Sequence, residues 1–539
     1  MTGSRPGAPV RARKAARLVL ATALAFVALG VGVGRQAVAS EPINGGGSTW
    51  SAVAVQAWQA DVARQGLTVN YQATGSTAGR QGYTSGIYDF AISEIPFQPQ
   101  YCTTPGVQST CYDEQTQPGL LARPYVYMPI VAGGTSLLYN LQIDGQKFTH
   151  LQLSPVTLAK IFTGGITNWD NPAIAAENPG VPFPNLTIQP VVRSDGAGTS
   201  YQFTAFMAFE DPADWNAFCQ RAGIQQDPCP PTSQFPYSAL PNSEAEDGSD
   251  GVANWVAAPY DNGSIGYAEA AYGLDRGVPL ASLQNAAGAY VQPTAKAVAV
   301  ALTRAIINSD NTQNLTGVYT NPDPRTYPMS SYSYMIVPTT DAAPMDASKG
   351  ATLGAFILYF LCQGQQEAAP LGYSPLPPNL VQIGFEAEQK IPGAPRPPPI
   401  QDCNDPTITD GFLNGIGTPI VIYINGQGHG GPASGSTSTS AGDRSRGTSG
   451  SSGRSTQGHA SSSRKATSPT TNRQRPGGQG APLLATSSPQ QFGKLFRPMS
   501  DVLLAVVVLA VLAVLVAPRA PESVRSARER RRGTSSDPG

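Results

Sequence analysis

Three short turns rich in glycine, serine and threonine contain residue types that suit the binding of an anion. They are 44–50 (NGGGSTW), 74–79 (TGSTAG) and 194–200 (SDGAGTS). Glycine lets the backbone approach a ligand, and the first N–H groups of a helix have no intrahelical partner, so turns that open helices form anion sites. Arg193 directly precedes the third turn, and its planar guanidinium suits a tetrahedral oxyanion. Simple helix capping is the alternative for each turn, and a surface ion pair is the alternative for Arg193.

Hydrophobic spacing predicts the strands and helices that must position these turns. Val53, Trp58 and Val62 recur at roughly helical spacing after the first turn. The expected elements are a helix over 51–64, a strand over 67–71 with a helix toward 87, and a strand over 186–193 with a helix over 201–209. Because β-branched runs alternate with helical stretches through residues 41–425, the sequence predicts an α/β fold.

The sequence of these turns does not match nucleotide-binding or catalytic motifs. None has the lysine of a G-x-x-x-x-G-K-[ST] loop, and Ser76 stands one place too early for a G-x-S-x-G nucleophile turn. His150 is the only histidine between residues 41 and 425, which disfavours a Ser-His-Asp or Cys-His arrangement. A phosphoryl hydrolase would need a metal cluster or an activated nucleophile. We therefore expect no enzyme, no cofactor and no metal site.

The formal net charge of −1 of the 539-residue chain hides a separation of charge along it. Residues 41–425, the body, carry 14 basic and 31 acidic side chains, a net of −17. Residues 1–40 carry 6 basic and no acidic side chains, and residues 426–500 carry 9 basic and 1 acidic. We expect no nucleic acid as a partner. An acidic body also repels anions through its overall field, so any bound anion must be held by local donors.

The two ends of the chain predict export and attachment to a membrane. Basic residues, an apolar run and a small-residue site predict a signal peptide over 1–40, with an uncleaved anchor as the alternative. Residues 426–500 predict a disordered Gly/Ser-rich basic linker. Residues 501–518 include 16 consecutive Val, Leu and Ala residues and predict a transmembrane helix, with a buried soluble helix as the alternative. The basic tail, 519–539, favours the cytoplasm, so we expect a single-pass protein of the cell membrane with its body outside.

All six cysteines lie in the acidic body, which agrees with export. In an exported protein, several cysteines indicate disulfide bonds, whereas a zinc site would need the tighter C-x(2–4)-C spacing. The first four cysteines form two close sequence pairs, and two remain. We expect the disulfides Cys102–Cys111, Cys219–Cys229 and Cys362–Cys403.

Several stretches, by their order and spacing, resemble the phosphate-binding protein of bacterial ABC phosphate transporters, which has a periplasmic-binding-protein fold. They are 45–50 (GGGSTW), 71–76 (YQATGS), 88–94 (YDFAISE), 161–169 (IFTGGITNW), 193–200 (RSDGAGTS) and 263–267 (GSIGY). The resemblance runs from Ile43 to Pro338 and continues more weakly to residue 425. It implies an α/β, two-lobed periplasmic-binding-protein fold, type II-like. Lobe one is then 41–131 plus 329–425, and lobe two is 132–328.

The resemblance also implies a set of phosphate-binding residues. Carried over motif by motif, they are Thr49, Trp50, Ser76, Glu94, Arg193, Ala197, Gly198 and Thr199. Glu94 stands where the family usually has Asp, and Ala197 where it usually has Ser. A buried carboxylate accepts the proton that phosphate retains near neutral pH and repels sulfate, which carries none. The longer Glu94 and the hydroxyl missing at Ala197 are expected to alter affinity or selectivity.

The function that the resemblance implies is that of an extracellular solute-binding protein. Such a protein captures inorganic phosphate between its lobes by a hinge motion and delivers it to an ABC permease. The predicted linker and membrane helix would tether it. They also favour an alternative, a cell-surface sensing or adhesion protein that reuses the fold without transport, because transporter receptors are typically lipid-anchored or freely diffusing.

Overall fold

The computed structural model of the chain describes residues 40–104, 107–116, 120–121 and 123–421. The predicted linker, transmembrane helix and tail, and the signal peptide up to residue 39, lie outside the described residues. Within the described ranges, no helix is long and apolar enough to cross a membrane.

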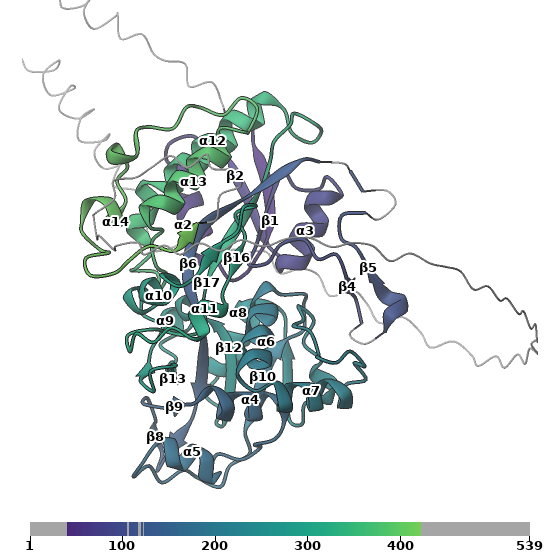
Figure 1. Cartoon of the computed structure of the whole chain (residues 1–539), viewed down its shortest axis with the longest axis vertical. Helices are drawn as coiled ribbons and strands as arrows, with labels where there is room; N and C mark the ends of the chain where they lie inside the picture. The colour runs from purple at the N-terminus through teal and green to yellow at the C-terminus, as the bar shows by residue number, and fades with distance from the viewer. Residues whose placement is uncertain (1–39, 105–106, 117–119, 122, 422–539) are drawn as a thin grey trace, which may run out of the picture. The chain divides into compact units, whose positions relative to one another are not determined.

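A single eight-stranded sheet runs through the body (Figure 1). In spatial order its strands are β11 (Glu244–Glu246), β10 (Gln189–Arg193), β12 (Ser264–Glu269), β6 (Tyr125–Asn140), β17 (Ser330–Pro338), β3 (Phe90–Ser93), β1 (Ile43–Gly47) and β2 (Val69–Ala73). The strand β1 is parallel to β2 and β3, and β10 is parallel to β11 and β12. The predicted α/β fold is confirmed.

The long strand β6 passes from one half of the sheet to the other. Its 16 residues change partner between Gly134 and Thr135, since Tyr125–Gly134 pairs with β17 and Thr135–Asn140 pairs with β12, both antiparallel. We call the part around β17, β3, β1 and β2 lobe one, and the part around β12, β10 and β11 lobe two. The lobe boundaries taken from the sequence stay predictions.

Helices pack on the lobe-one strands through aromatic side chains. They are α2 (Ala52–Ala63), α3 (Ser76–Thr84), α12 (Ala347–Leu361) and α13 (Pro378–Glu388). Trp58 of α2 stacks on Phe360 of α12 with ring centroids 5.0 Å apart, and its indole N–H donates to the Gly364 carbonyl over 2.9 Å. Asp346 caps α12 by accepting from the N–H groups of its first residues, which fixes where this helix begins. The helix that follows the first turn, α2, is therefore anchored by residues that lie 306 positions later in the chain.

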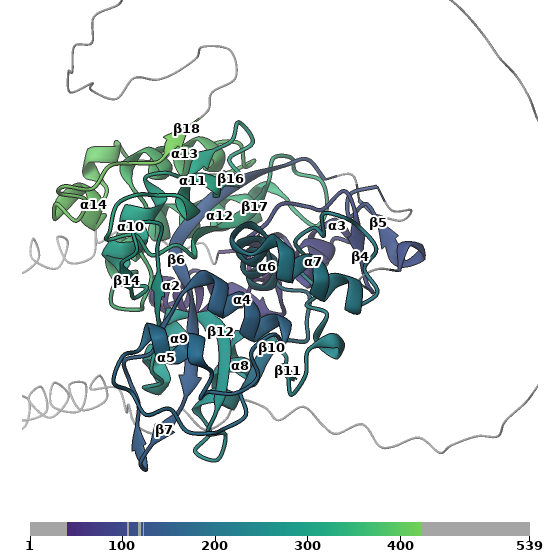
Figure 2. The ribbon, with the colours of Figure 1, turned by 60° about the horizontal axis from the view of Figure 1, so that its bottom comes forward.

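Lobe two has helices on both faces of its strands. On one face α4 (Pro155–Thr163), α6 (Gly198–Glu210) and α7 (Pro212–Arg221) contact one another (Figure 2), and α8 (Gly248–Ala257) with α9 (Ala270–Arg276) forms a second group. The ring of Phe203 in α6 stacks on Tyr267 of β12 at 4.3 Å, and Phe162 of α4 meets Phe203 edge to face at 4.9 Å. These contacts hold α6 against β12 and α4. Gly198, the first residue of α6, lies next to Glu94 of lobe one.

Shorter elements complete the described residues. The helices are α5 (Pro172–Glu177), α10 (Ala295–Leu302), α11 (Thr316–Tyr319) and α14 (Pro406–Thr409), and the strands are β4 (Tyr101–Cys102), β5 (Cys111–Tyr112), β7 (Gln142–Ile143), β8 (Gln146–Lys147), β9 (Gln152–Leu153), β13 (Ser282–Gln284), β14 (Tyr290–Val291), β15 (Ile306–Ile307), β16 (Gln313–Asn314) and β18 (Ile420–Val421). Because β15 pairs with β18, the chain near residue 306 packs against its last described residues.

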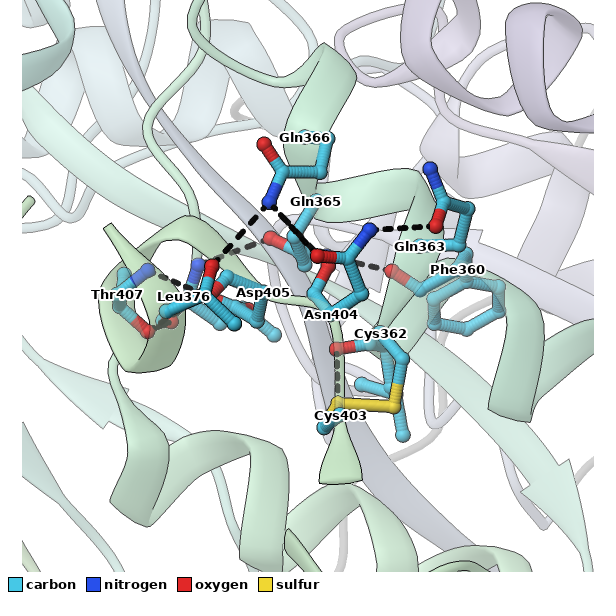
Figure 3. Close-up of a disulfide and its surroundings, with 12 residues drawn as sticks. Phe360, Cys362, Gln363, Gln365, Gln366, Leu376, Cys403, Asn404, Asp405 and Thr407 are labelled. Carbon is cyan, nitrogen blue, oxygen red and sulfur yellow. Dashed lines mark hydrogen bonds between the residues drawn. A yellow bond between two sulfur atoms is a disulfide. The ribbon is translucent and has the colours of Figure 1, made fainter. Parts of the chain in front are cut away.

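Three disulfides close loops in the body, and their pairing is the one expected from the spacing of the cysteines: Cys102–Cys111, Cys219–Cys229 and Cys362–Cys403. The third joins the end of α12 to the segment before α14 (Figure 3). Beside it, the Asn404 amide donates to the Gln363 side chain over 2.6 Å. The Thr407 hydroxyl donates to the Leu376 carbonyl over 2.8 Å. The last described segment is thus fastened to lobe one by one covalent bond and several hydrogen bonds.

Candidate functional site

The three glycine-rich stretches all reach the carboxyl ends of parallel strands. The structure places residues 44–47 of the first stretch in β1 itself, so only Ser48, Thr49 and Trp50 form the turn after that strand. The second stretch follows β2 and opens α3, and the third follows β10 and opens α6. Ligands of open α/β sheets bind at this edge. The long strand β6 joins the two sets of strands in one sheet, so turns from separate lobes meet at one place between them.

The first turn reaches across the gap between the lobes. Gly47 has φ 130°, and a side chain there would overlap with the Ile92 carbonyl of the neighbouring strand, so glycine permits the bend. The hydroxyl of Thr49 lies 3.0 Å from that of Ser249 in lobe two, and its oxygen accepts from the Ser249 N–H over 3.2 Å. Tyr272, also in lobe two, donates to the Thr49 carbonyl over 2.6 Å. Thr49 is therefore held by the opposite lobe.

Trp50 is placed by the strand that crosses between the lobes. Its indole N–H donates to the Thr135 hydroxyl over 3.3 Å, and its carbonyl accepts from Tyr373 over 2.6 Å. A side chain at Gly133 of β6 would collide with the Trp50 ring, so the ring packs directly on the backbone of the crossing strand. The side chain of Trp50 is thus committed to packing at the crossing strand.

The second turn begins α3 at Ser76. Gly75, with φ 89°, stands at the N-cap position. The Ser76 hydroxyl donates to Glu94 Oε2 over 2.6 Å, and the next N–H, that of Thr77, donates to the Gly196 carbonyl of lobe two over 3.0 Å. The second turn therefore contacts both the carboxylate and the third turn.

Glu94 directly follows β3 and is a buried carboxylate, 1% exposed. Three serine hydroxyls donate to it: Ser76 to Oε2, and Ser48 and Ser333 to Oε1, the last over 2.9 Å. Its Oε2 also faces Gly198 at the start of α6 in lobe two, where any side chain would overlap with it. The longer side chain of Glu94 thus reaches the N-terminus of the helix in the other lobe.

Arg193 ends β10 and is also 1% exposed. Its guanidinium forms a two-pronged ion pair with Asp195 through Nε, at 2.6 Å, and Nη2. The remaining nitrogen, Nη1, donates to the hydroxyls of Ser249 over 3.0 Å and Thr199 over 3.4 Å. Burial alone would lower the pKa of Arg193, but the Asp195 carboxylate raises it above its ordinary value. The guanidinium is therefore a permanent, oriented cation, and the surface ion pair considered for Arg193 does not describe it.

Ala197, Gly198 and Thr199 form the start of α6. The N–H of Ala197 donates to the Ser233 carbonyl over 2.9 Å, so this group is already used within lobe two. Gly198 and Thr199 occupy the first helical positions, whose N–H groups have no intrahelical partner. The structure brings Thr49, Ser76, Glu94, Arg193, Gly198 and Thr199 together, whereas the Trp50 side chain and the Ala197 N–H point to other partners.

Four further side chains belong to this cluster and were not singled out from the sequence: Ser48, Ser249, Glu269 and Ser333. Ser249 is the second residue of α8, in a fourth segment of the same kind, Asp247-Gly248-Ser249, which opens this helix. That turn carries the same glycine and serine signal as the other three. Ser48 lies within the first turn, whereas a serine in a strand, such as Ser333, carries no signal of its own.

Glu269, like Glu94, is a buried carboxylate of the cluster. Its Oε1 accepts from the Thr199 hydroxyl over 3.1 Å. Burial raises the pKa of Glu269 to about 7, against the lowering influence of the Ser249 hydroxyl and Arg193. Within the described ranges, no group of three His, Cys, Asp or Glu side chains has the geometry to hold a metal ion. The arrangement can hold a small oxyanion through hydroxyls, helix N–H groups and Arg193.

Comparisons with known proteins show the family of this chain. The PBP superfamily domain matches residues 33–363. The phosphate-binding protein PstS of Xylella fastidiosa is 32% identical over 347 residues, which cover 64% of this chain and 84% of that protein. This chain belongs to the PstS family. A second PstS protein, from Pasteurella multocida, is 28% identical over 348 residues, covering 64% of this chain and 88% of its own.

A solved structure of a phosphate-binding protein from Stenotrophomonas maltophilia is 19% identical, covers 71% of this chain and 100% of that chain, and has a TM-score of 0.45. Membership of the PstS family confirms the two-lobed periplasmic-binding-protein fold that the resemblance implied. The domain match ends at residue 363, so α13, α14 and most of the loop closed by Cys362 and Cys403 lie beyond it.

Proposed function

We propose that this PstS-family protein captures inorganic phosphate between its two lobes. The proposal is supported most by one observation: Arg193 and Glu94 lie together with hydroxyls from four turns, where the two lobes face each other. These hydroxyls belong to Thr49, Ser76, Thr199 and Ser249. Each of these groups is buried, so it is strong as a donor or acceptor and costly to leave without a partner.

The positive end of the site comes from lobe two. Arg193 is the basic side chain of the cluster, and the N-termini of α6 and α8 add N–H groups and partial positive charge. Asp195 holds the guanidinium in one orientation and balances its charge. These local donors overcome the net charge of −17 of residues 41–425.

The acceptor comes from lobe one. Phosphate near neutral pH still carries a proton and can donate it to the Glu94 carboxylate, whereas sulfate has no proton to give. A fully ionised sulfate would face a buried carboxylate without compensation, which costs several kcal/mol in a site shielded from water. Glu94 is therefore the residue that distinguishes the two ions.

Capture requires the lobes to move apart and close again. Contacts between the lobes hold the described arrangement, among them Thr49 with Ser249 and the Thr77 N–H with the Gly196 carbonyl. The crossing segment of β6, between Gly134 and Thr135, is the hinge, because each other strand of the sheet pairs within one lobe. An ion that bridges Arg193 and Ser76 would add to these contacts and favour the closed state.

The same proposal includes delivery of phosphate to an ABC permease by a tethered receptor. What supports it is the membership of the PstS family together with the predicted linker over 426–500 and membrane helix over 501–518. A body on such a linker stays close to the membrane in which its permease lies.

Calorimetry on the full chain tests the proposal. Phosphate and arsenate, which both carry a proton near neutral pH, should bind, and sulfate should not. Arg325→Ala is the matched control for the Arg193→Ala variant, because Arg325 forms an exposed ion pair with Asp323 away from the cluster. Absence of phosphate binding at millimolar concentration would contradict the proposed function.

A further inference from the structure

The proposed function gives no role to the carboxylate of Glu269, although this carboxylate lies in the same cluster. Glu269 ends β12 and precedes α9, and it is 1% exposed. Its Oε1 accepts the Thr199 hydroxyl over 3.1 Å, while its Oε2 is buried and has no hydrogen-bond partner among the described residues. A buried carboxylate oxygen without a partner is costly when the group is ionised.

The groups around Glu269 compensate its charge only in part. The charged and titratable side chains that face it are Arg193 from β10, Glu94 after β3, Tyr272 from α9 and Tyr373 beyond α12. Only Arg193 is a cation, and its Nε and Nη2 already serve Asp195. The cluster therefore holds three carboxylates, Glu94, Asp195 and Glu269, against one guanidinium, before any anion enters.

The Thr199 hydroxyl is caught between two uses. It has a single proton, which it donates to Glu269 Oε1, while its oxygen accepts from Arg193 Nη1 over 3.4 Å. While Glu269 is ionised, Thr199 cannot donate to a ligand as well. A protonated Glu269 instead donates to the Thr199 oxygen, which has room for two donors, and this frees the Thr199 proton.

We propose that Glu269 is a positioning residue whose protonation turns the Thr199 hydroxyl toward the bound phosphate, so that phosphate binding takes up a proton from solvent. The inference rests on the proposed function. One proton moves from the buffer acid to Glu269: an O–H bond forms on the carboxylate, the bond to that proton breaks in the buffer acid, and the buffer base is released. Protonation also removes one of three negative charges from the site as the anion arrives, which favours binding electrostatically.

The pH at which this occurs follows from the burial of Glu269. Burial, opposed by Ser249 and Arg193, raises the pKa of Glu269 to about 7. Above that pH the free protein has ionised Glu269, and binding must take up the proton. Below it, Glu269 is already protonated and uptake is small. Phosphate affinity should therefore fall by up to roughly tenfold for each pH unit above 7, beyond the change due to phosphate itself.

Glu269→Gln separates this role from a purely structural one. The amide is isosteric with the protonated acid and donates to Thr199 at every pH. Calorimetry with inorganic phosphate at pH 8, in two buffers of different ionisation enthalpy, measures proton uptake by the full chain. The wild type should take up close to one proton more than Glu269→Gln, whose affinity should lose the added pH dependence.

Glu388→Gln is the matched control, because Glu388 is a buried acid of α13 outside the cluster whose pKa burial also raises to about 7. It should take up the same number of protons as the wild type. Equal uptake by the wild type and Glu269→Gln would overturn the inference while leaving phosphate capture intact. Failure of the wild type to bind phosphate would contradict the proposed function and this inference with it.

Discussion

Gly198 of lobe two faces the carboxylate of Glu94 in lobe one so closely that a methyl group on Gly198 would overlap with Glu94 Oε2. Gly198 is the first residue of α6, and Glu94 follows β3. The contact exists only when the lobes are together. The absence of a side chain at position 198 is thus a condition for closing the site around the carboxylate.

Gly198→Ala should weaken phosphate binding at least about tenfold, because the added methyl group keeps the lobes from closing. Folding should be little changed, since alanine is a better helix former than glycine. Gly165→Ala is the control: its methyl group would meet the Lys160 side chain at an ordinary 3.5 Å, away from the cluster. Calorimetry with phosphate checks both variants, and equal affinity of Gly198→Ala and wild type would contradict the closed arrangement.

Arg193→Ala should also weaken phosphate binding at least about tenfold, because it removes a charge-assisted contact in a buried site. Arg193→Lys keeps the charge but loses the two-pronged pair with Asp195, so an intermediate affinity is expected. Circular dichroism confirms folding before the titration. Unchanged affinity of a folded Arg193→Ala variant would place the site elsewhere.

Much of this site follows from the local sequence. The turns at 44–50, 74–79 and 194–200 and Arg193 are visible because glycine and serine before helical spacing have a direct physical meaning. Asp195 stands two residues from Arg193, yet nothing in the sequence shows that the two pair rather than meet a ligand.

The rest depends on contacts between distant parts of the chain. Ser333 reaches Glu94 across 239 residues, because β17 pairs with β3 in lobe one. Ser249 reaches Thr49 across 200 residues, because β6 joins the two lobes. Partners of this kind become visible only with the strand order, which the local pattern of residues does not contain.

Removal of the third disulfide should destabilise the body. Cys362 and Cys403 are 41 residues apart, and opening a loop of this length costs roughly 3–4 kcal/mol of the free energy of unfolding. The double variant Cys362→Ser/Cys403→Ser should therefore unfold at lower denaturant concentration. Cys102→Ser/Cys111→Ser, which opens a loop of separation 9, should cost about 1 kcal/mol less. The reverse order of the two midpoints would contradict this account.

Asp405, beside the third disulfide (Figure 3), should make stability depend on pH. Its Oδ1 caps α14, its Oδ2 has no partner among the described residues, and burial raises its pKa from 3.8 to about 7. As pH rises from 3.8 to about 7 the unfolded chain ionises first, so the native state loses stability over that window.

Asp405→Asn keeps the cap and removes this titration. Its free energy of unfolding should exceed that of the wild type at pH 8 and not at pH 4, as measured by chemical denaturation. Asp402→Asn, at an exposed position nearby, should match the wild type at both pH values. An identical pH dependence for Asp405→Asn and the wild type would contradict the buried, protonated state of Asp405.

Selection of phosphate by Glu94, through acceptance of the phosphate proton, is tested by competition between phosphate and sulfate. Calorimetry at neutral pH should show the wild type binding phosphate and not sulfate. Glu94→Gln, which can donate as well as accept, should bind sulfate and should lose much of the preference for phosphate. Equal binding of both ions by the wild type, or an unchanged preference of Glu94→Gln for phosphate over sulfate, would contradict selection of phosphate by the Glu94 carboxylate.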